Sequence, residues 1–230
     1  MSKSPFRWSI DWSGIILSDD NLLIPNTWTI TFDYDAVDDN MLHRDIAMQR
    51  LEFMIDQKFS TATWTNFENP WVNIFHEKMN TFVITVPGDP YDSLIAAVAM
   101  LKAQAITKSV LDIHCVSIVS KLGYTVENVI EWEEAAEMGL AIEHPHFSDG
   151  PWYMREDAGF TDLLVTEEEQ PTLIKDSSSW ATHDLNWDYY DNKENKLSPV
   201  TSFIHNNQNE RWVPLVIKGG KPGDKDKDED

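Results

Sequence analysis

Large hydrophobic side chains alternate with polar ones near the N-terminus of the chain. They recur at every second residue, at Phe6, Trp8, Ile10 and Trp12. Between residues 27 and 34, aromatic residues and Ile30 alternate with threonine and aspartate. Side chains two residues apart lie on the same face of a β-strand. Both segments are therefore predicted to be strands with one buried face, and residues 27–34, rich in β-branched and aromatic side chains, give the clearer signal.

The hydrophobic spacing changes to that of a helix in two later segments. The first carries apolar residues four apart, at Ala47, Leu51, Ile55 and Phe59. Asp38 and Asp39 precede it as candidate N-caps, so a helix of roughly twenty residues is predicted there. The second segment follows an Asp-Pro pair at 89–90, typical of a helix start, and carries one apolar face over residues 91–105. The two segments are predicted to be amphipathic helices.

Short apolar runs predict four further strands. They lie at residues 71–76, 81–86, 111–119 and 124–130. The first two are close enough in sequence to form a hairpin. The middle of the chain then has the order β-α-β-β-α-β, which resembles the split βαβ, or ferredoxin-like, arrangement in element order alone. We expect an α+β fold with an antiparallel sheet, both helices on one face, and extra strands at 6–12 and 124–130 that extend the sheet.

Composition divides the chain into three parts. Residues 1–142 contain the periodic patterns and are predicted to be an α+β sheet domain. Residues 143–218 are acidic, aromatic-rich and punctuated by proline, which predicts a largely irregular extension packed on that domain. Residues 219–230 lack large hydrophobic side chains and are predicted to be a disordered acidic tail.

The charge balance narrows the classes of partner. The chain has 39 acidic and 18 basic residues, a net charge of −21. Binding to nucleic acid or to an anionic membrane depends on lysine and arginine, so direct contact with either is not expected. Cys115 is the only cysteine, which excludes an intrachain disulfide, and no apolar run reaches the roughly 18 residues of a membrane span. We expect a soluble, intracellular protein of the cytoplasm.

The acidic excess is concentrated in residues 127–194, which contain 18 acidic and three basic residues. The candidate partner-binding residues of this segment are Trp152, Tyr153, Trp180, Asp184, Trp187, Asp188, Tyr189 and Tyr190. In one interpretation the aromatic side chains are exposed anchors for a basic protein, and the carboxylates imitate the phosphates of a nucleic acid. In the other, the aromatic side chains fold back over the sheet as a lid while the acids face solvent. The sequence leaves both interpretations open.

A second acidic cluster lies at the end of the clearest strand. Asp33 and Asp35 are candidate Mg²⁺ ligands, with Glu77 of the predicted hairpin as a third. In this part the chain resembles palm-type nucleotidyl-transfer domains, which share the element order and hold metals on the first strand and near the central hairpin. It departs from them because the glycine-rich acidic turn is missing. Interpreted locally, Asp33, Asp35, Asp38 and Asp39 form an aspartate-rich turn followed by a helix N-cap.

Other chemistry-bearing residues give weaker signals. His144 and His146 lie two apart in a proline-containing loop without a third ligand at a zinc-site spacing, which favours solvated histidines. His114, in an apolar run, is expected to be a sheet residue, and Cys115 a small buried one. The chain contains no Gly-x-Ser-x-Gly sequence.

Two functional hypotheses follow from these patterns. The first is a non-enzymatic protein, without a cofactor, whose acidic and aromatic half binds a basic protein partner. An inhibitor of a nucleic-acid-binding protein and a subunit of a larger assembly, for example a viral one, are two versions of it, and self-association is left open. The alternative is a metal-dependent phosphoryl- or nucleotidyl-transfer enzyme that uses Asp33, Asp35 and Glu77 with Mg²⁺.

Overall fold

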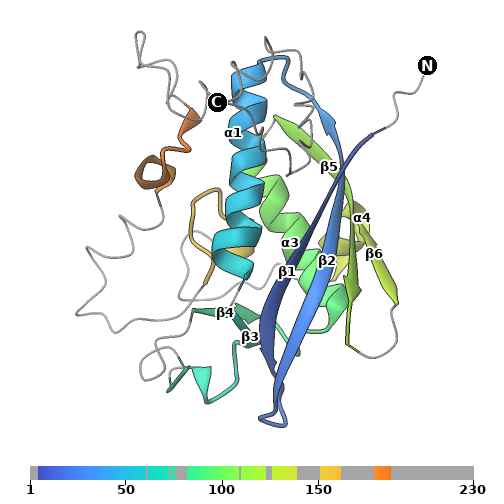
Figure 1. Cartoon of the computed structure of the whole chain (residues 1–230), viewed down its shortest axis with the longest axis vertical. Coiled ribbons are helices and arrows are strands. Elements are labelled where there is room, and N and C mark those ends of the chain that lie inside the picture. Colours follow the sequence, from blue (N-terminus) through green and yellow to red (C-terminus); the bar gives the residue numbers. More distant parts are fainter. Residues whose placement is uncertain are drawn as a thin grey trace, which may run out of the picture. The chain divides into compact units, whose positions relative to one another are not determined.

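A computed structural model describes residues 5–60, 62–72, 74–75, 82–108, 110–122, 126–138, 151–161 and 179–187. Six strands form one sheet in the order β4-β3-β1-β2-β5-β6 (Figure 1). The strands are β1 (Phe6–Leu17), β2 (Leu23–Ala36), β3 (Thr63–Asn66), β4 (Val83–Val86), β5 (Leu111–Ser120) and β6 (Glu127–Glu131). The helical segments are α1 (Met41–Glu52), η1 (Phe53–Phe59), α3 (Asp92–Thr107), α4 (Trp132–Glu137), η2 (Trp152–Met154) and η3 (Trp180–His183).

The central element of the sheet is the long antiparallel hairpin of β1 and β2. Its two faces differ, as the period-two pattern predicts. On the helix-facing side, the rings of Trp12 and Trp28 stack with centroids 4.1 Å apart. On the outer side, the hydroxyls of Ser9 and Thr31 lie 2.8 Å apart. Burial of one face and solvation of the other fixes the register, because a shift by one residue would exchange them.

Gly14 lets the chain that enters β3 approach β1 closely. The backbone N–H of Ile15 donates to the carbonyl of Ala62 at 3.0 Å. A Cβ atom at position 14 would lie only 3.0 Å from the same carbonyl oxygen. Glycine therefore allows this close contact, and a larger residue would require the Ala62 carbonyl to shift; the parallel pairing of β1 with β3 begins here.

The first predicted helix is present, and α1 continues directly into η1, a π-helical turn. The buried residues of the pair are Ile46, Ala47, Arg50, Leu51, Met54, Ile55 and Phe59. The cap differs from the prediction, because the side chain of Asn40, rather than of Asp38 or Asp39, accepts the backbone N–H of Leu42 at 3.0 Å. Asp38 instead accepts the N–H of Asn40 at 2.8 Å, which sets up the cap.

The second predicted helix, α3, begins two residues later than its proline signal suggests. Tyr91 occupies the N-cap position, in place of the predicted Asp89. Asp92, in the first turn, accepts a hydrogen bond at 2.8 Å from the indole of Trp28 on β2. Figure 1 shows α1 and α3 together on one side of the sheet, so the apolar faces of both helices and the inner face of the sheet share one core.

The predicted strand at residues 71–76 is wrong. Residues 71–72 and 74–75 form turn and helical structure, and the strand of this region is β3, in the preceding threonine-rich segment. Thr63, Trp64 and Thr65 are all buried, so β3 lacks the alternation that marks a strand with one solvated face. The companion prediction at 81–86 is confirmed by β4.

The α+β class is confirmed, but the sheet is not the antiparallel, ferredoxin-like sheet expected from the element order. β3 runs parallel to both β1 and β4, while the other pairings are antiparallel. Parallel neighbours cannot be joined by a tight hairpin, so the predicted hairpin is not the connection between β3 and β4. β1 lies in the interior of the sheet rather than at its edge. The two edge strands of the described sheet are β4 and β6. No described helix is long and apolar enough to cross a membrane.

Candidate functional site

Three of the candidate partner-binding aromatics belong to the hydrophobic core. Trp152 is 0 % exposed, Tyr153 2 % and Trp180 8 %. The indole N–H of Trp152 donates to the carbonyl of Thr85 at 2.8 Å, and that of Trp180 to the carbonyl of Glu156 at 2.6 Å. These contacts satisfy the polar edge of each buried ring. These three side chains are therefore buried in the core and are not exposed.

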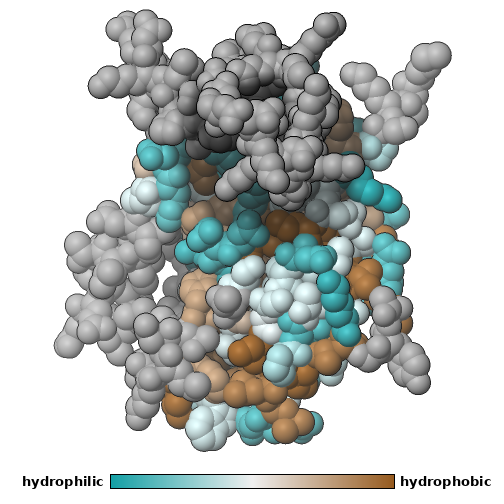
Figure 2. All heavy atoms as spheres, in the orientation of Figure 1, coloured by the Kyte–Doolittle hydropathy of each residue, from teal (hydrophilic) through white to brown (hydrophobic). Residues whose placement is uncertain are grey.

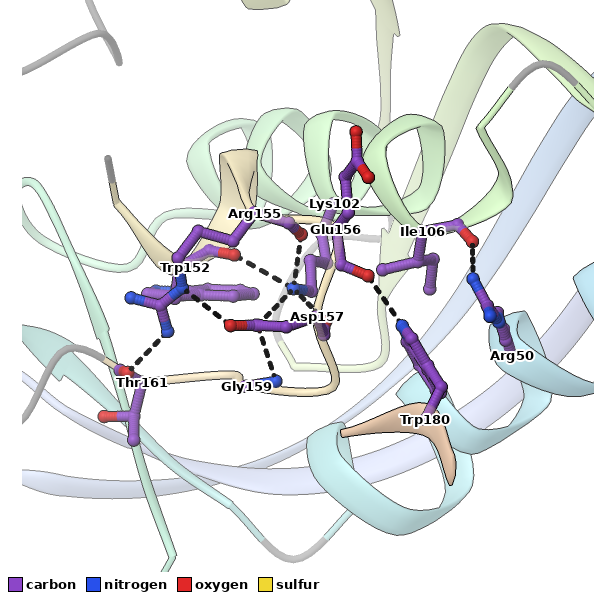
Figure 3. A network of polar contacts seen from close by, with 10 residues as sticks. All are labelled: Arg50, Lys102, Ile106, Trp152, Arg155, Glu156, Asp157, Gly159, Thr161 and Trp180. Carbon is purple, nitrogen blue, oxygen red and sulfur yellow. Dashed lines mark hydrogen bonds and ion pairs between the residues drawn. The ribbon is translucent and has the colours of Figure 1, made fainter. Parts of the chain in front are cut away.

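The segment of residues 151–161 is held by a buried cation on α3. The ammonium of Lys102, 0 % exposed, donates to the carbonyls of Trp152, Arg155 and Asp157 at 3.0, 2.8 and 2.8 Å (Figure 3). The Asp157 carboxylate lies 3.7 Å away, and the ring of Phe160 is 4.7 Å from the ammonium nitrogen. A buried charge is tolerated only when it is paired and hydrogen-bonded, and the irregular backbone supplies the oxygens here.

A second buried cation, Arg50 of α1, holds the segment of residues 179–187. Its guanidinium donates twice to the carbonyl of Leu185, at 2.9 and 2.7 Å, and once to that of Ile106 at 2.9 Å. The same group lies over the rings of Trp180 and Trp187, 4.6 and 3.8 Å from their centroids. Burial lowers the pKa of Arg50 to about 10, so the group stays charged at neutral pH.

The remaining candidate partner-binding residues have different positions. Trp187 is half-buried beneath Arg50, and Asp184 is exposed at the end of η3 in a left-handed backbone conformation. Asp188, Tyr189 and Tyr190 lie outside the described residues. Among the described candidate partner-binding residues, the aromatic side chains are buried or half-buried and Asp184 faces solvent.

Two of the candidate metal ligands, Asp33 and Asp35, each contact a different basic side chain. Arg7 on β1 donates to both carboxylate oxygens of Asp33, at 2.7 and 2.6 Å, and this hydrogen bond lowers the pKa of Asp33. Asp35 lies 3.0 Å from the Nε2 atom of His114 on β5. A register shift after Asp33 leaves His114 as an extra residue on β5, between Cys115 opposite Asp33 and Ile113 opposite Tyr34. Glu77 lies outside the described residues, and the described residues contain no group of three potential ligands that could hold a metal ion.

A cavity of about 520 Å³ opens beside β5 and β6. Its lining residues are Gln104, Asp112, Ile113, His114, Cys115, Glu131, Trp132 and Glu133. Burial, followed by the charges of Asp33 and Glu131, raises the pKa of the Cys115 thiol. The thiol is thus kept protonated, which disfavours a nucleophilic role, and the acidic lining suits a cationic side chain.

The clearest combination of exposed acids and exposed apolar groups lies where β1 turns into β2. We call it the hairpin-tip surface. It consists of Asp19, Asp20, Leu22, Leu23, Phe67, Trp71, Asp89 and Tyr91, all of which are exposed except the half-buried Asp89. Figure 2 shows hydrophobic and hydrophilic residues side by side at the end of the molecule where Figure 1 places this turn. Exposed apolar side chains gathered in this way are typical of a protein-contact surface.

Local hydrogen bonds hold the hairpin-tip surface in place. Asn21, with φ of 62°, closes the turn by donating its N–H to the carbonyl of Ser18 at 2.9 Å. The N–H of Asp19 donates to the Asp89 carboxylate at 3.2 Å, which joins the turn to the start of α3. The Asn69 side chain donates to the carbonyl of Ser18 at 3.3 Å. The surface is therefore built from three segments that are distant in sequence.

The Asp89 carboxylate links the phenol of Tyr91 to the hairpin turn. Tyr91 is 67 % exposed, and its hydroxyl donates to Asp89 at 3.2 Å. This hydrogen bond, and then the charges of Asp89, Asp19 and Asp20, raise the Tyr91 pKa. Within the described part of the chain, no ion pair involves any of these three aspartates. The result is an acidic surface whose charge no lysine or arginine of the described segments neutralises.

Sequence reasoning missed the hairpin-tip surface. Its acids and apolar residues come from three short segments between periodic elements, and none has a motif spacing. The only available signal was a pair of adjacent leucines beside two aspartates in a turn, at residues 19–23. The sequence matches no protein-family model and no curated protein.

Proposed function

We propose that the chain is a non-enzymatic protein that binds a basic protein partner, and that the hairpin-tip surface is the contact site. The observation that carries this proposal is the hairpin-tip surface itself, where Asp89 contacts both the exposed Tyr91 and the backbone of Asp19. Its aspartates form no ion pair within the described residues, and exposed leucines belong to the same surface. A partner surface with lysine or arginine next to apolar side chains complements both features. The net charge of −21 adds long-range attraction for such a partner.

Two settings fit a basic partner of this kind. One is inhibition of a nucleic-acid-binding protein, whose lysines and arginines would meet carboxylates in place of phosphates. The other is assembly into a larger complex, such as a viral one. In both, the partner surface is basic and no cofactor is involved.

The alternative, metal-dependent phosphoryl transfer, is less well supported. It requires Asp33 and Asp35 to share a metal ion, whereas Arg7 and His114 engage them separately. Mg²⁺ would have to displace a bidentate guanidinium from Asp33 before the two carboxylates act together.

The test compares capture of binding proteins by full-length variants. Wild-type chain, an Asp19→Lys/Asp20→Lys variant and an Asp56→Lys variant are immobilised and exposed to lysate at low and high salt. Asp56 is an exposed residue of η1, so Asp56→Lys is the control for the reversal of a single charge elsewhere on the surface. Recovered proteins are identified by mass spectrometry, purified and titrated against each variant.

We expect a basic protein that binds the wild type and the Asp56→Lys control and loses affinity for the hairpin-tip variant and at high salt. A Leu22→Ser/Leu23→Ser variant should also weaken binding, but without changing its salt dependence. Equal binding to all variants, or recovery of acidic proteins only, would overturn the proposal.

A further inference from the structure

The edge of the sheet formed by β6 is a second candidate interaction surface, made of other residues than the hairpin tip. β6 pairs with β5 on one side, from Glu127 opposite Val119 to Glu131 opposite Cys115. It is the last strand of the sheet, and among the described residues no strand pairs with its other side. An edge strand directs the N–H and C=O groups of every second residue away from the sheet, where another extended chain can bind them.

The exposed side chains of β6 have a regular pattern. Glu127, Val129 and Glu131 are exposed on the outer face of the sheet, and Val129 is 49 % exposed. Asn128 and Ile130 point toward the helix layer, where they are half-buried and buried. The edge therefore presents acid, apolar and acid side chains at positions i, i+2 and i+4.

We propose that β6 accepts an extended basic segment of a partner protein as a seventh strand. In that segment, lysine or arginine would lie opposite Glu127 and Glu131, with an apolar residue opposite Val129. Main-chain hydrogen bonds to the strand edge supply affinity, and the cross-strand pairs supply selectivity. The acid-apolar-acid pattern is the same in both directions, so the charges admit a parallel or an antiparallel segment.

A second copy of the chain does not suit this edge. In antiparallel self-pairing centred on Val129, Glu127 of one copy would lie opposite Glu131 of the other, at both ends of the pairing. Like charges directly opposite each other destabilise a strand pair. Charged residues placed in this way on an edge strand disfavour self-association. They still allow an oppositely charged strand to bind the edge.

The cavity beside β5 and β6 lies at the Glu131 end of the proposed contact. Asp112, Glu131 and Glu133 contribute its carboxylates, and Trp132, 40 % exposed, contributes an aromatic surface. A long cationic side chain opposite Glu131 can reach acids there while its methylene stem contacts the indole. The cavity thus extends the charge complementarity of the strand edge.

The experiment uses the full chain, labelled with ¹⁵N, and a synthetic peptide with Lys-Thr-Val-Thr-Lys at its centre. Binding is followed by amide chemical shifts, and each peptide nitrogen is then methylated in turn to remove one donor at a time. We expect shifts centred on β6, and a loss of binding at every second methylated position, because only alternate N–H groups face the edge. Binding without this alternation would overturn the proposal.

Charge-swap variants provide the specificity test. A Glu127→Lys/Glu131→Lys variant should bind the peptide about tenfold more weakly, since two attractive cross-strand pairs become repulsive. The same variant should instead bind a Glu-Thr-Val-Thr-Glu peptide, which shows that it is still folded. The Asp19→Lys/Asp20→Lys variant keeps the β6 edge and should bind the first peptide with nearly unchanged affinity.

These outcomes separate the two surfaces. Loss of binding in the hairpin-tip variant, equal to that in the β6 variant, would show that the peptide responds to net charge alone and would overturn the strand-edge proposal. The contact proposed for the hairpin tip would be unaffected by that result.

Discussion

Arg50 donates two hydrogen bonds to the backbone carbonyl of Leu185, a residue 135 positions later in the chain. The bond joins α1 to the short segment that contains η3. Lys102 makes a similar connection between α3 and residues 151–161. Both cations bind main-chain carbonyls, so irregular segments can pack on the helices without leaving these carbonyls unpaired.

Replacing Arg50 with Met should lower the free energy of unfolding by about 3 kcal/mol, because two buried carbonyls lose their charged donor. The desolvation cost of the guanidinium is removed as well, which keeps the loss from being larger. Chemical denaturation at neutral pH measures the change. Lys121→Met is the control, because Lys121 forms an exposed ion pair with Asp11, and its effect should be much smaller. Equal effects of the two substitutions would contradict the role given to Arg50.

Replacing Lys102 with Met should release residues 151–161 locally. The methionine fills a similar volume but donates no hydrogen bond to the three carbonyls, so the free energy of unfolding should fall by about 2–4 kcal/mol. Hydrogen exchange followed by mass spectrometry should show faster exchange in 151–161, with β5 still protected. Lys108→Met is the control, since Lys108 is the C-cap residue of the same helix and pairs with Glu156 at the exposed surface. Unchanged exchange in 151–161 of the Lys102 variant would refute this prediction.

The amount of structure that the sequence predicts depends on periodicity. β1, β2 and α1 have one buried and one more exposed face, so the spacing of their apolar side chains indicates the secondary structure directly. α3 is buried on every side from Ile95 to Ala103, and its length and alanine-rich composition indicate a helix instead. β3 is buried on both faces, so it has no alternation of buried and solvated side chains. Its parallel pairing with β1 and β4 depends on contacts between distant segments, which element order does not specify.

The sequence could not show whether the aromatic side chains of the acidic half are buried or exposed, and the reason is a different one. Lysine and arginine usually mark solvated positions, so Lys102 and Arg50 gave no sign of being buried donors to irregular backbone. Unless these two buried donors are known, the sequence supports buried and exposed positions of Trp152 and Trp180 equally well. The acids at residues 19–20 and 89 meet only through the hairpin turn, which no local pattern encodes.

Acid should reduce stability partly through Asp33. Arg7 lowers the pKa of Asp33, so the carboxylate stabilises the folded state at pH values above its unfolded pKa of about 3.8. That contribution is lost as pH falls through the lower, folded pKa. An Arg7→Gln variant should be less stable than the wild type at neutral pH, and the two stability curves should converge in strong acid. Denaturation at a series of pH values provides the measurement, and a difference that grows toward low pH would contradict it.

The ionisation of Tyr91 reports on the charges at the hairpin tip. Its pKa is raised first by the hydrogen bond to Asp89, which ionisation of the phenol breaks, and then by the charges of Asp89, Asp19 and Asp20. Asp89→Asn should therefore lower the Tyr91 pKa, and Asp19→Asn should lower it by less, because Asp19 acts through charge alone. Titration of ¹³C-labelled tyrosine by NMR gives the value for this ring.

The salt dependence separates the two causes of the Tyr91 shift. Added salt screens exposed charges, so it should reduce the contribution of Asp19 and Asp20 more than that of the direct hydrogen bond. Asp56→Asn removes one charge elsewhere on the surface and should leave the Tyr91 pKa unchanged. A bound basic partner brings positive charge to the phenolate and should lower the pKa in the wild type. A Tyr91 pKa that responds equally to Asp89→Asn and Asp56→Asn would mean that net charge, rather than this local cluster, controls the ring.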